Sequence, residues 1–292
     1  MKTYNVDTDI LIYKAAISAE KATDWNNGTW TLEADMEAGV RNLDAQVEDI
    51  KKAVGFSKGD IFQHYLSDPD RSRLVRKKLL PSYKNNRTSS RRPMLISPLW
   101  DYVANELGGR WLKGREGDDM LGINQTADSV CVSVDKDMLT IPGYHYNILK
   151  PEQGVILQSL KAADSFFYQQ ALAGDPVDGY SGCPGIGMKT AASILGDEPH
   201  IILRATYHLK SGKNKGELKE TWYKEYHDDY TPWDTIASYY RKAGLTNEDA
   251  LTQGRMARIV RAEDTQGLDN SEIELWQPMK MKLWKRNVIK VR

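Results

Sequence analysis

The sequence predicts an α/β protein with a mainly parallel central sheet flanked by helices, followed by a mostly helical C-terminal subdomain. Two observations support this fold class. Short apolar runs that suit buried strands alternate with longer stretches whose apolar residues recur every three or four positions. Parallel strands are joined by crossover helices, so this alternation is typical of a parallel sheet. The chain has 292 residues, which is enough to bury a full core.

Strands are predicted where short apolar runs lead into acidic residues. Residues 3–6 form a buried strand that delivers Asp7, and residues 60–66 form a second strand that ends near Asp68. The clearest strand is 129–134, which is rich in β-branched residues and bounded by charge. A further strand is expected at 110–113, after a pair of glycines.

Helices are predicted where apolar residues follow helical spacing. One strong amphipathic stripe consists of Leu32, Met36, Val40, Leu43, Val47, Ile50 and Val54. Another helix is expected to begin at Ser97-Pro98, and a third to span 118–127. A later helical face, which should stop at Gly174, consists of Leu157, Leu160, Phe167 and Ala171.

The last third of the chain is expected to be mostly helical. A glycine-rich turn at 182–187 leads into a helix through Ala192 and Leu195, and the polar loop SGKNKG at 211–216 interrupts the region 200–292. The sequence therefore predicts an α/β core at 1–174, with a basic segment at about 70–97, and a second region at 175–292.

Composition excludes several classes of protein. Apolar residues make up 40% of the chain and the mean hydropathy is −0.58. No apolar run approaches the ~20 residues that span a membrane, and the N-terminus has no export signal, so we expect a cytoplasmic protein. The two cysteines, Cys131 and Cys183, lack metal-ligand spacing and are expected to be free thiols.

The formal net charge is zero, but the charge is segregated along the chain. From Arg71 to Arg92 there are nine basic residues and no acid, and a second basic run extends from Met279 to Arg292. Segregated charge can bind phosphate even when the total cancels. The alternatives are solvated faces or a mobile tail.

Acidic residues form four groups that follow strands or helix ends. The groups are Asp7 with Asp9; Glu116, Asp118 and Asp119; Asp135 with Asp137; and Asp175 with Asp178. Because ligands bind at the C-terminal ends of parallel strands, these groups are expected to converge there. Converging carboxylates repel one another unless cations lie among them, and Mg²⁺ prefers oxygen ligands. The pattern predicts a pair of divalent ions that activate water against a phosphodiester.

The basic segment supplies candidates for handling phosphate. If it is helical when substrate binds, Lys84 and Arg87 share one face and can neutralise a scissile phosphate, while Tyr83 can stack on an unpaired base. The alternative is a basic loop that provides only nonspecific affinity.

The glycine-rich turn provides a second phosphate-binding candidate. Backbone N–H groups at Gly185 and Gly187, the following helix N-terminus and Lys189 all favour an anion. A simple tight turn is the alternative explanation for these glycines.

Together these motifs resemble the 5′-nuclease superfamily, which includes flap endonucleases and phage 5′→3′ exonucleases. The matching pieces are VDTD (6–9), PSYKNNR (81–87), EGDDM (116–120), SVDKDM (133–138) and GDPVDGYSGCPGIGMKTA (174–191). Further likeness to the gene-six-type exonucleases of short-tailed T-odd phages lies in LKSGKNKG (209–216), WDTI (233–236), GRMARIVR (254–261) and EIELWQP (272–278).

The resemblance implies roles for particular residues. Metal ligands or their supporting groups would be Asp7, Asp68, Glu116, Asp118, Asp119, Asp135, Asp137, Asp175 and Asp178. Lys84, Arg87 and Tyr83 would belong to a helical arch over the active site. Predicted DNA contacts are Arg76, Arg91, Arg92, Gly185, Gly187, Lys189 and Thr190. Asp9 competes with Asp7 as a ligand, and Asp70 competes with Asp68.

The resemblance also implies cofactors and partners. Two Mg²⁺ ions, replaceable by Mn²⁺, would serve the reaction, and K⁺ would bind at a helix-hairpin-helix element. Substrates would be double-stranded DNA with 5′ ends, RNA–DNA hybrids and 5′ flaps. Partners would be phage replication proteins such as a single-strand-binding protein, in an infected bacterial cell.

Three alternatives stay open from the sequence. A haloacid-dehalogenase-like phosphatase would use Asp7 as nucleophile and Asp9 as acid, and it leaves the EGDD cluster and the basic segment unexplained. A DNA-binding protein without catalysis would have no need of the intact acid set. A PIN-type ribonuclease shares the core geometry but not the glycine hairpin.

Overall fold

The computed structural model of the chain describes residues 1–85, 91–265, 275–278 and 290–291. These residues form two compact units, Met1–Asp164 with Ile259–Glu274, and Ser165–Arg258 with Leu275–Arg292. The boundary predicted at residues 174 and 175 falls inside the second unit and stays a prediction about separate domains. Among the described residues, no helix combines the length and apolar character needed to cross a membrane.

The first unit is built around a five-stranded sheet with the order β4-β1-β5-β6-β7. Its strands are β1 (Thr3–Asp7), β4 (Ile61–Tyr65), β5 (Ser129–Ser133), β6 (Gly143–Asn147) and β7 (Val155–Gln158). The first four are mutually parallel and β7 is antiparallel to β6. The predicted α/β class with a mainly parallel sheet is therefore confirmed, and the sheet is mixed at one edge.

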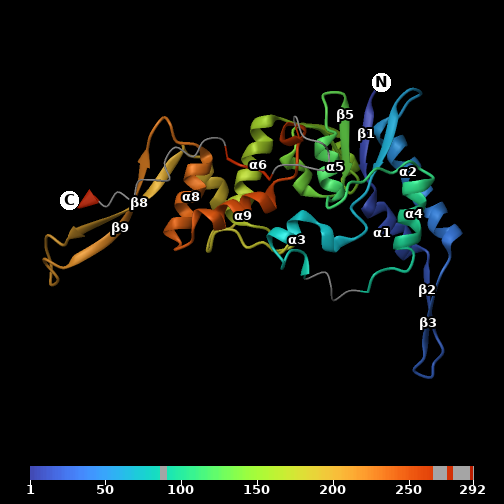
Figure 1. The fold of residues 1–292 in the computed structure, drawn as a ribbon, viewed down its shortest axis with the longest axis horizontal. Helices are drawn as coiled ribbons and strands as arrows, with labels where there is room; N and C mark the ends of the chain where they lie inside the picture. The colour runs from blue at the N-terminus through green and yellow to red at the C-terminus, as the bar shows by residue number, and fades with distance from the viewer. Residues whose placement is uncertain (86–90, 266–274, 279–289, 292) are drawn as a thin grey trace. The chain divides into compact units, whose positions relative to one another are not determined.

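Helices cover both faces of this sheet (Figure 1). They are α1 (Thr8–Ser18), α2 (Met36–Val54), α4 (Ile96–Asn105) and α5 (Gly117–Ile123), while the short helix α3 (Val75–Leu79) packs beside residues 71–73. On one face, Val6 and Val132 pack with Leu11, Leu43 and Leu99 from α1, α2 and α4. On the other face, Tyr65 and Cys131 pack with Met120 and Leu121 of α5. Successive strand residues point to opposite faces, which explains why both layers find an apolar surface.

The ends of α2 show why the helix has these limits. Asp35 accepts a hydrogen bond from Glu37 N at 2.9 Å and caps the first turn. Gly55 ends the helix with φ of 68°, a left-handed conformation that glycine adopts without strain. Leu32 was predicted in this helix and instead lies in β3 (Trp30–Ala34), which pairs with β2 (Glu20–Asp24) in a separate hairpin.

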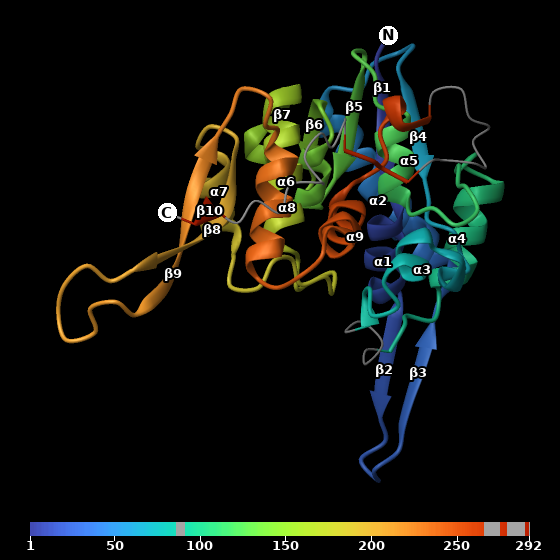
Figure 2. The same cartoon turned by 60° about the vertical axis from the view of Figure 1, so that its left-hand side comes forward.

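The second unit contains helices and a long hairpin (Figure 2). Its elements are α7 (Met188–Leu195), β8 (His200–His208), β9 (Leu218–Tyr226), α8 (Pro232–Lys242), α9 (Asn247–Ala257) and β10 (Lys290–Val291). The helix α6 (Leu160–Ala173) begins in the first unit and continues into the second. The predicted helix after the glycine-rich turn is confirmed as α7.

Further predictions also differ from the structure. Leu157, predicted on the helical face that ends at Gly174, lies in β7. The prediction of a strand at 110–113 is wrong, since the structure has only an isolated bridge between Tyr65 and Arg110 in this segment. The prediction of a mostly helical region at 200–292 is also wrong, because β8 and β9 pair over nine residues each. Both cysteines are buried and free, as predicted.

Candidate metal centre

Acidic residues meet where the neighbouring parallel strands β1 and β5 end. Asp7 is the last residue of β1, and Asp135 follows the end of β5. Ser133 joins them, because its hydroxyl donates to Asp7 Oδ2 at 3.1 Å and accepts from Asp135 N at 3.1 Å. The topology therefore fixes two carboxylates of separate motifs at one edge of the sheet.

The acids at this edge repel one another. Burial raises the pKa of Asp7 to about 7, and the charges of Asp9 and Asp135 add to the effect, while the Ser133 hydrogen bond opposes it. Burial also raises the pKa of Asp118 well above its ordinary value, with further increase from Asp7 and Asp135. Excess negative charge is thus concentrated at the sheet edge, where protons or cations must compensate it.

Glu116 belongs to the same cluster but has cationic partners. Lys84 Nζ lies 2.7 Å from Glu116 Oε1, Arg76 Nη1 lies 2.6 Å from Oε2, and the Tyr83 hydroxyl donates to Oε2 at 3.0 Å. Burial alone would raise the pKa of Glu116, yet the charges of Lys84 and Arg76 hold it at about 2. Glu116 is therefore an anion at every physiological pH.

Asp119 shares Arg76 with Glu116. The guanidinium donates to Asp119 Oδ1 at 2.8 Å and to Oδ2 at 3.2 Å, and Val260 N donates to Oδ1 at 3.2 Å. Arg76, Glu116 and Asp119 are all buried, so they form an internal ion cluster. Two of the predicted metal ligands thus have oxygens that are already occupied by protein donors.

The Asp68 carboxylate accepts hydrogen bonds from a different set of donors. Its buried carboxylate accepts from Gly114 N at 2.7 Å, from Asp70 N at 2.9 Å and from Arg73 Nη2 at 2.6 Å. Burial would raise the pKa of Asp68, but these donors lower it. Its competitor Asp70 is exposed and accepts from the Ser72 backbone and hydroxyl.

Asp9, the competitor of Asp7, also lies at the sheet edge. Asp9 Oδ2 accepts from Ser67 N at 3.0 Å, and burial raises the pKa of this carboxyl. Asp137 is half-buried, its backbone N donates to Asp135 Oδ1 at 2.8 Å, and its carboxylate pairs with Lys136 at 2.9 Å. Both Asp7 and Asp9 therefore stay candidates.

Asp175 and Asp178 lie in the second unit. Asp175 is buried, and its Oδ1 accepts from Val177 N at 2.8 Å within a turn, while Asp178 is half-buried. Their role as ligands stays a prediction from the sequence.

The basic segment is arranged differently from the expectation. Residues 81–85 form turns, and Lys84 has φ of 53°. Tyr83 is 2% exposed and bonded to Glu116, so this conformation does not offer its ring to a base. Arg76 is buried against Glu116 and Asp119, so it is a structural cation rather than an exposed DNA contact. The predicted roles of Tyr83 and Arg76 with DNA therefore stay predictions from the sequence.

Other predicted contacts are at the surface or outside the described residues. Arg87 lies outside them. Arg91 and Arg92 are exposed, and Arg91 pairs with Glu20. In the second unit, the four predicted contacts around the start of α7 are all exposed: Gly185, Gly187, Lys189 and Thr190.

The turn before α7 owes its shape to a close crossing of two glycines. A Cβ atom on Gly174 would lie 2.3 Å from Gly182 N, and one on Gly182 would lie 2.2 Å from Ala173 C. Both glycines have positive φ, of 74° and 65°. In contrast, Gly185 and Gly187 have open space around them, which leaves room for a ligand at the backbone.

Sequence analysis missed three residues that organise the site. Ser133 links two strand ends, Arg73 neutralises Asp68, and Ser67 donates its backbone N–H to Asp9. The signal for Ser133 was present, since it ends the clearest strand beside Asp135. Nothing in the sequence distinguishes Arg73 from its basic neighbours.

The donor chemistry fits divalent cations, although the cluster is not arranged around one. All candidate ligands are carboxylates, which suit Mg²⁺. Within the described ranges, no three His, Cys, Asp or Glu side chains are grouped as a ready metal site. Lys84 and Arg76 instead occupy Glu116 and Asp119 oxygens.

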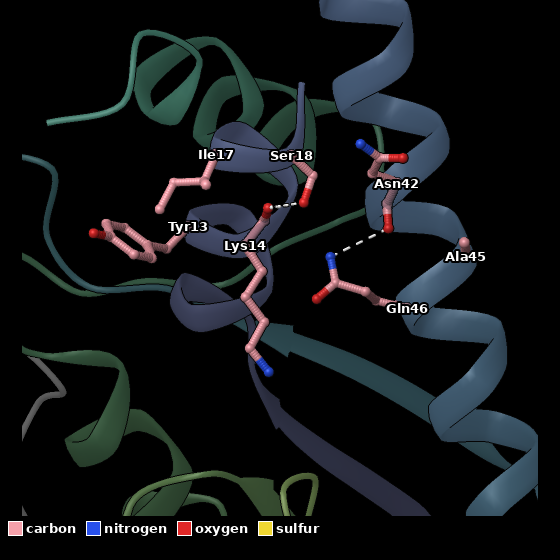
Figure 3. A pocket seen from close by; sticks show the side chains of 7 residues that line it. All are labelled: Tyr13, Lys14, Ile17, Ser18, Asn42, Ala45 and Gln46. Carbon is pink, nitrogen blue, oxygen red and sulfur yellow. Dashed lines mark hydrogen bonds between the residues drawn. The ribbon is translucent and has the colours of Figure 1, made fainter. Parts of the chain in front are cut away.

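A depression of about 550 Å³ lies elsewhere on the first unit, between α1 and α2 (Figure 3). Its lining residues are Tyr13, Lys14, Ile17, Ser18, Asn42, Ala45 and Gln46. None of them is a carboxylate, so this depression does not offer a divalent-ion site.

The chain is similar to known phage exonucleases over almost its full length. It is 32% identical over 290 residues to an exodeoxyribonuclease of Enterobacteria phage T3, covering 94% of this chain and 92% of that protein. It is 32% identical over 286 residues to an exonuclease of Escherichia phage T7, with the same coverage of 94% and 92%. A shorter match, 32% over 201 residues, joins 62% of this chain to 18% of a DNA polymerase I of Rhizobium leguminosarum.

The fold has a counterpart among solved structures. A T5 5′-exonuclease with bound zinc aligns with a TM-score of 0.50 and 14% identity over 88% of each chain. No family model matches the sequence. The identities to the T3 and T7 proteins nevertheless extend across both units of the chain. The chain therefore belongs to the phage exonuclease family of the T3 and T7 proteins, within the 5′-nuclease superfamily.

Proposed function

We propose that this chain is a magnesium-dependent 5′→3′ exodeoxyribonuclease that hydrolyses double-stranded DNA from 5′ ends and releases 5′-phosphate products. Its further substrates are RNA–DNA hybrids and 5′ flaps, and its setting is phage DNA replication and host DNA degradation in the cytoplasm of an infected cell. The similarity to the T3 and T7 exonucleases supports the activity class.

The observation that carries the mechanism is the mutual repulsion of Asp7, Asp118 and Asp135 at the C-terminal edge of the sheet. These carboxylates, with Asp9 and Asp137 beside them, would hold two Mg²⁺ or Mn²⁺ ions. When bound, such ions lower the pKa of an attacking water and neutralise charge on the leaving oxygen. Ser133 would keep Asp7 and Asp135 oriented across the two strand ends.

Lys84 would exchange partners during the reaction. In the described conformation it neutralises Glu116. A scissile phosphate would attract Lys84 away, which frees a Glu116 oxygen for cation binding and places positive charge against the phosphate. Arg87 would add to this charge. With Lys84 in place, the pKa of Glu116 is about 2. Once Lys84 leaves, Arg76 and the bound cation would keep Glu116 ionised.

The second unit would hold the duplex. The turn between α6 and α7 would act as the helix-hairpin-helix element, in which exposed backbone N–H groups at Gly185 and Gly187 face phosphate and K⁺ supports the turn. Lys189 and Thr190 would extend that contact. Asp175 and Asp178 stay candidate ligands from the resemblance.

The test is cleavage of end-labelled duplex, flap and RNA–DNA substrates with Mg²⁺. We expect nucleotides or short oligonucleotides with 5′-phosphates to appear first from the labelled 5′ end, and EDTA to abolish the reaction. Hydrolysis of a phosphomonoester without DNA cleavage would instead indicate the phosphatase alternative. Duplex binding with no cleavage under Mg²⁺ or Mn²⁺ would overturn the proposal.

A further inference from the structure

The hairpin of β8 and β9 is anchored to α8 at its base. At its base, His200 N donates to Thr235 Oγ1 at 3.0 Å and Ile202 N donates to Ser238 Oγ at 3.0 Å, which fixes β8 against α8. The pairing then continues to His208 and Leu218, and both of these residues are exposed. Figures 1 and 2 both show the paired strands extending away from the helices of their own unit and ending in a loop.

The loop at the far end carries charge of a single sign. Residues 209–216 contain Lys210, Lys213 and Lys215 and no acid. All three lysines are exposed, and among the described residues none of them takes part in an ion pair. The lysines on the strands differ, since Lys219 pairs with Glu217 and Lys224 pairs with Asp197. Positive charge is therefore uncompensated only toward the tip.

The loop is held in one shape by its own hydrogen bonds. Gly216 N donates to Leu209 O at 2.9 Å, Leu209 N donates to Glu217 O at 3.0 Å, and Lys215 N donates to Gly212 O at 3.2 Å. Gly212 and Gly216 have φ of 88° and 90°, which other residues adopt only with strain. An ordered loop loses less conformational entropy on binding than a disordered one.

The second basic run of the sequence ends at the same strands. In β10, Lys290 and Val291 pair in parallel with Ala205 and Thr206 of β8. The basic residues that precede β10 lie outside the described residues, but the chain is tied to the hairpin at this point. The edge of β8 is thus paired with Lys290 and Val291, which belong to a run whose sequence contains no acid from Met279 onward.

We propose that the β8–β9 hairpin is a second DNA-backbone contact, which binds duplex phosphates through the loop at 209–216. A two-stranded ribbon has dimensions that a DNA major groove admits, and lysines on phosphates provide affinity without sequence preference. Exposed lysines beside glycines in the loop match a polyanion better than a folded protein partner, and the exposed apolar side chains Tyr207 and Leu218 lie on the strands that flank it. The inference rests on the proposed function only in taking DNA as the substrate.

The test compares two triple variants. Lys210→Ala/Lys213→Ala/Lys215→Ala removes the charge of the loop, and Lys52→Ala/Lys58→Ala/Lys150→Ala removes the same charge from exposed positions of the first unit. Binding of a fluorescent blunt duplex is measured by anisotropy in EDTA over a range of KCl concentrations. The loop variant should flatten the slope of log K against log[KCl] by about 0.9 for each phosphate that the loop no longer neutralises, while the control variant retains the wild-type slope.

Cleavage at saturating DNA separates this inference from the proposed function. With Mg²⁺ and single-turnover conditions, the loop variant should cut at the wild-type rate once duplex is saturating, and more slowly below saturation. A wild-type slope and affinity in the loop variant, with an unchanged melting temperature, would overturn the inference even if the enzyme cleaves DNA. A further outcome is the expected flatter slope in the loop variant together with a wild-type protein that never cleaves DNA. In that case the hairpin contact stands and the nuclease proposal fails.

Discussion

Lys84 Nζ lies 2.7 Å from Glu116 Oε1, and Arg76 Nη1 lies 2.6 Å from the other oxygen of the same carboxylate. A residue expected to face DNA is thereby paired with a residue expected to face a metal ion. The two roles are compatible if Lys84 leaves Glu116 when phosphate and divalent ions arrive together. Charge in the centre would then stay balanced both before and after substrate binds.

Lys84→Ala should therefore slow cleavage far more than it weakens DNA binding. The loss of one charge that stabilises the developing phosphate charge commonly costs ~10²–10³ in rate. The measurement is the single-turnover rate with Mg²⁺, compared with duplex affinity in EDTA. Lys78→Ala removes an exposed charge from α3 and serves as control. Equal losses of rate and affinity would reduce Lys84 to a binding contact.

The strand ends of the site could be predicted from the sequence, while its ion pairs could not. The buried runs before Asp7 and Asp135 have strand character, and parallel pairing places their ends together. In contrast, Lys84 and Glu116 are 32 positions apart, and nothing local indicates which of nine basic residues reaches that carboxylate. Pairing of charges over such separations depends on the completed fold.

The hairpins were missed because their residues lack the patterns that identify strands. In β9, seven of the nine residues are exposed, so no buried face imposes an alternation of apolar and polar residues. In β8, the apolar run at Ile201, Ile202 and Leu203 suits a helix as well as a strand. The backbone pairing that decides between them comes from a partner strand beyond a loop.

Asp135→Asn should abolish cleavage and leave duplex binding in EDTA close to that of the wild type. The substitution keeps the size of the side chain and the acceptor for Asp137 N, but it removes a charge that the divalent ions need. Asp128→Asn, at an exposed position before β5, is the matched control. If the Asp135→Asn variant cleaves DNA normally with Mg²⁺, Asp135 is not a metal ligand.

Asp7→Asn should stabilise the protein in metal-free buffer, with a gain that depends on pH. The pKa of Asp7 is about 7 in the folded protein and near 3.8 when exposed, so the folded state binds more protons between these values. Stability therefore falls as pH rises from about 4 to 7 and is lowest above 7. The neutral amide avoids this loss. The resulting gain in the free energy of unfolding is up to about 4 kcal/mol above pH 7 and vanishes below pH 4.

Thermal unfolding in EDTA at pH 5, 6, 7 and 8 tests the Asp7 prediction. The difference in melting temperature between variant and wild type should grow with pH and level off at pH 8. Asp44→Asn, on the exposed face of α2, should show no such trend. A gain that is constant with pH would mean that the charge of Asp7 is not the cause.

Arg76→Met should destabilise the fold by about 3–5 kcal/mol, because it leaves two buried carboxylates without their shared cation. Urea unfolding measures the loss. Arg41→Met removes an exposed pair with Glu37 and should have a much smaller effect, since water replaces that partner. Similar losses from both substitutions would contradict an internal role for Arg76. Mg²⁺ should recover part of the Arg76→Met loss, because divalent ions can neutralise the same carboxylates.

Lys189→Ala should flatten the salt dependence of duplex affinity by about 0.9 in the slope of log K against log[KCl], which corresponds to one phosphate contact. Lys189 is exposed in the first turn of α7, where the helix N-terminus already favours an anion. Anisotropy titrations in EDTA provide the slope, with Lys58→Ala as the control from the first unit. Since Lys189 lies far along the sequence from the predicted metal ligands of the first unit, the single-turnover rate at saturating DNA should stay within about twofold of wild type. An unchanged slope would remove Lys189 from the duplex contact and leave the crossing of Gly174 and Gly182 as a purely structural turn.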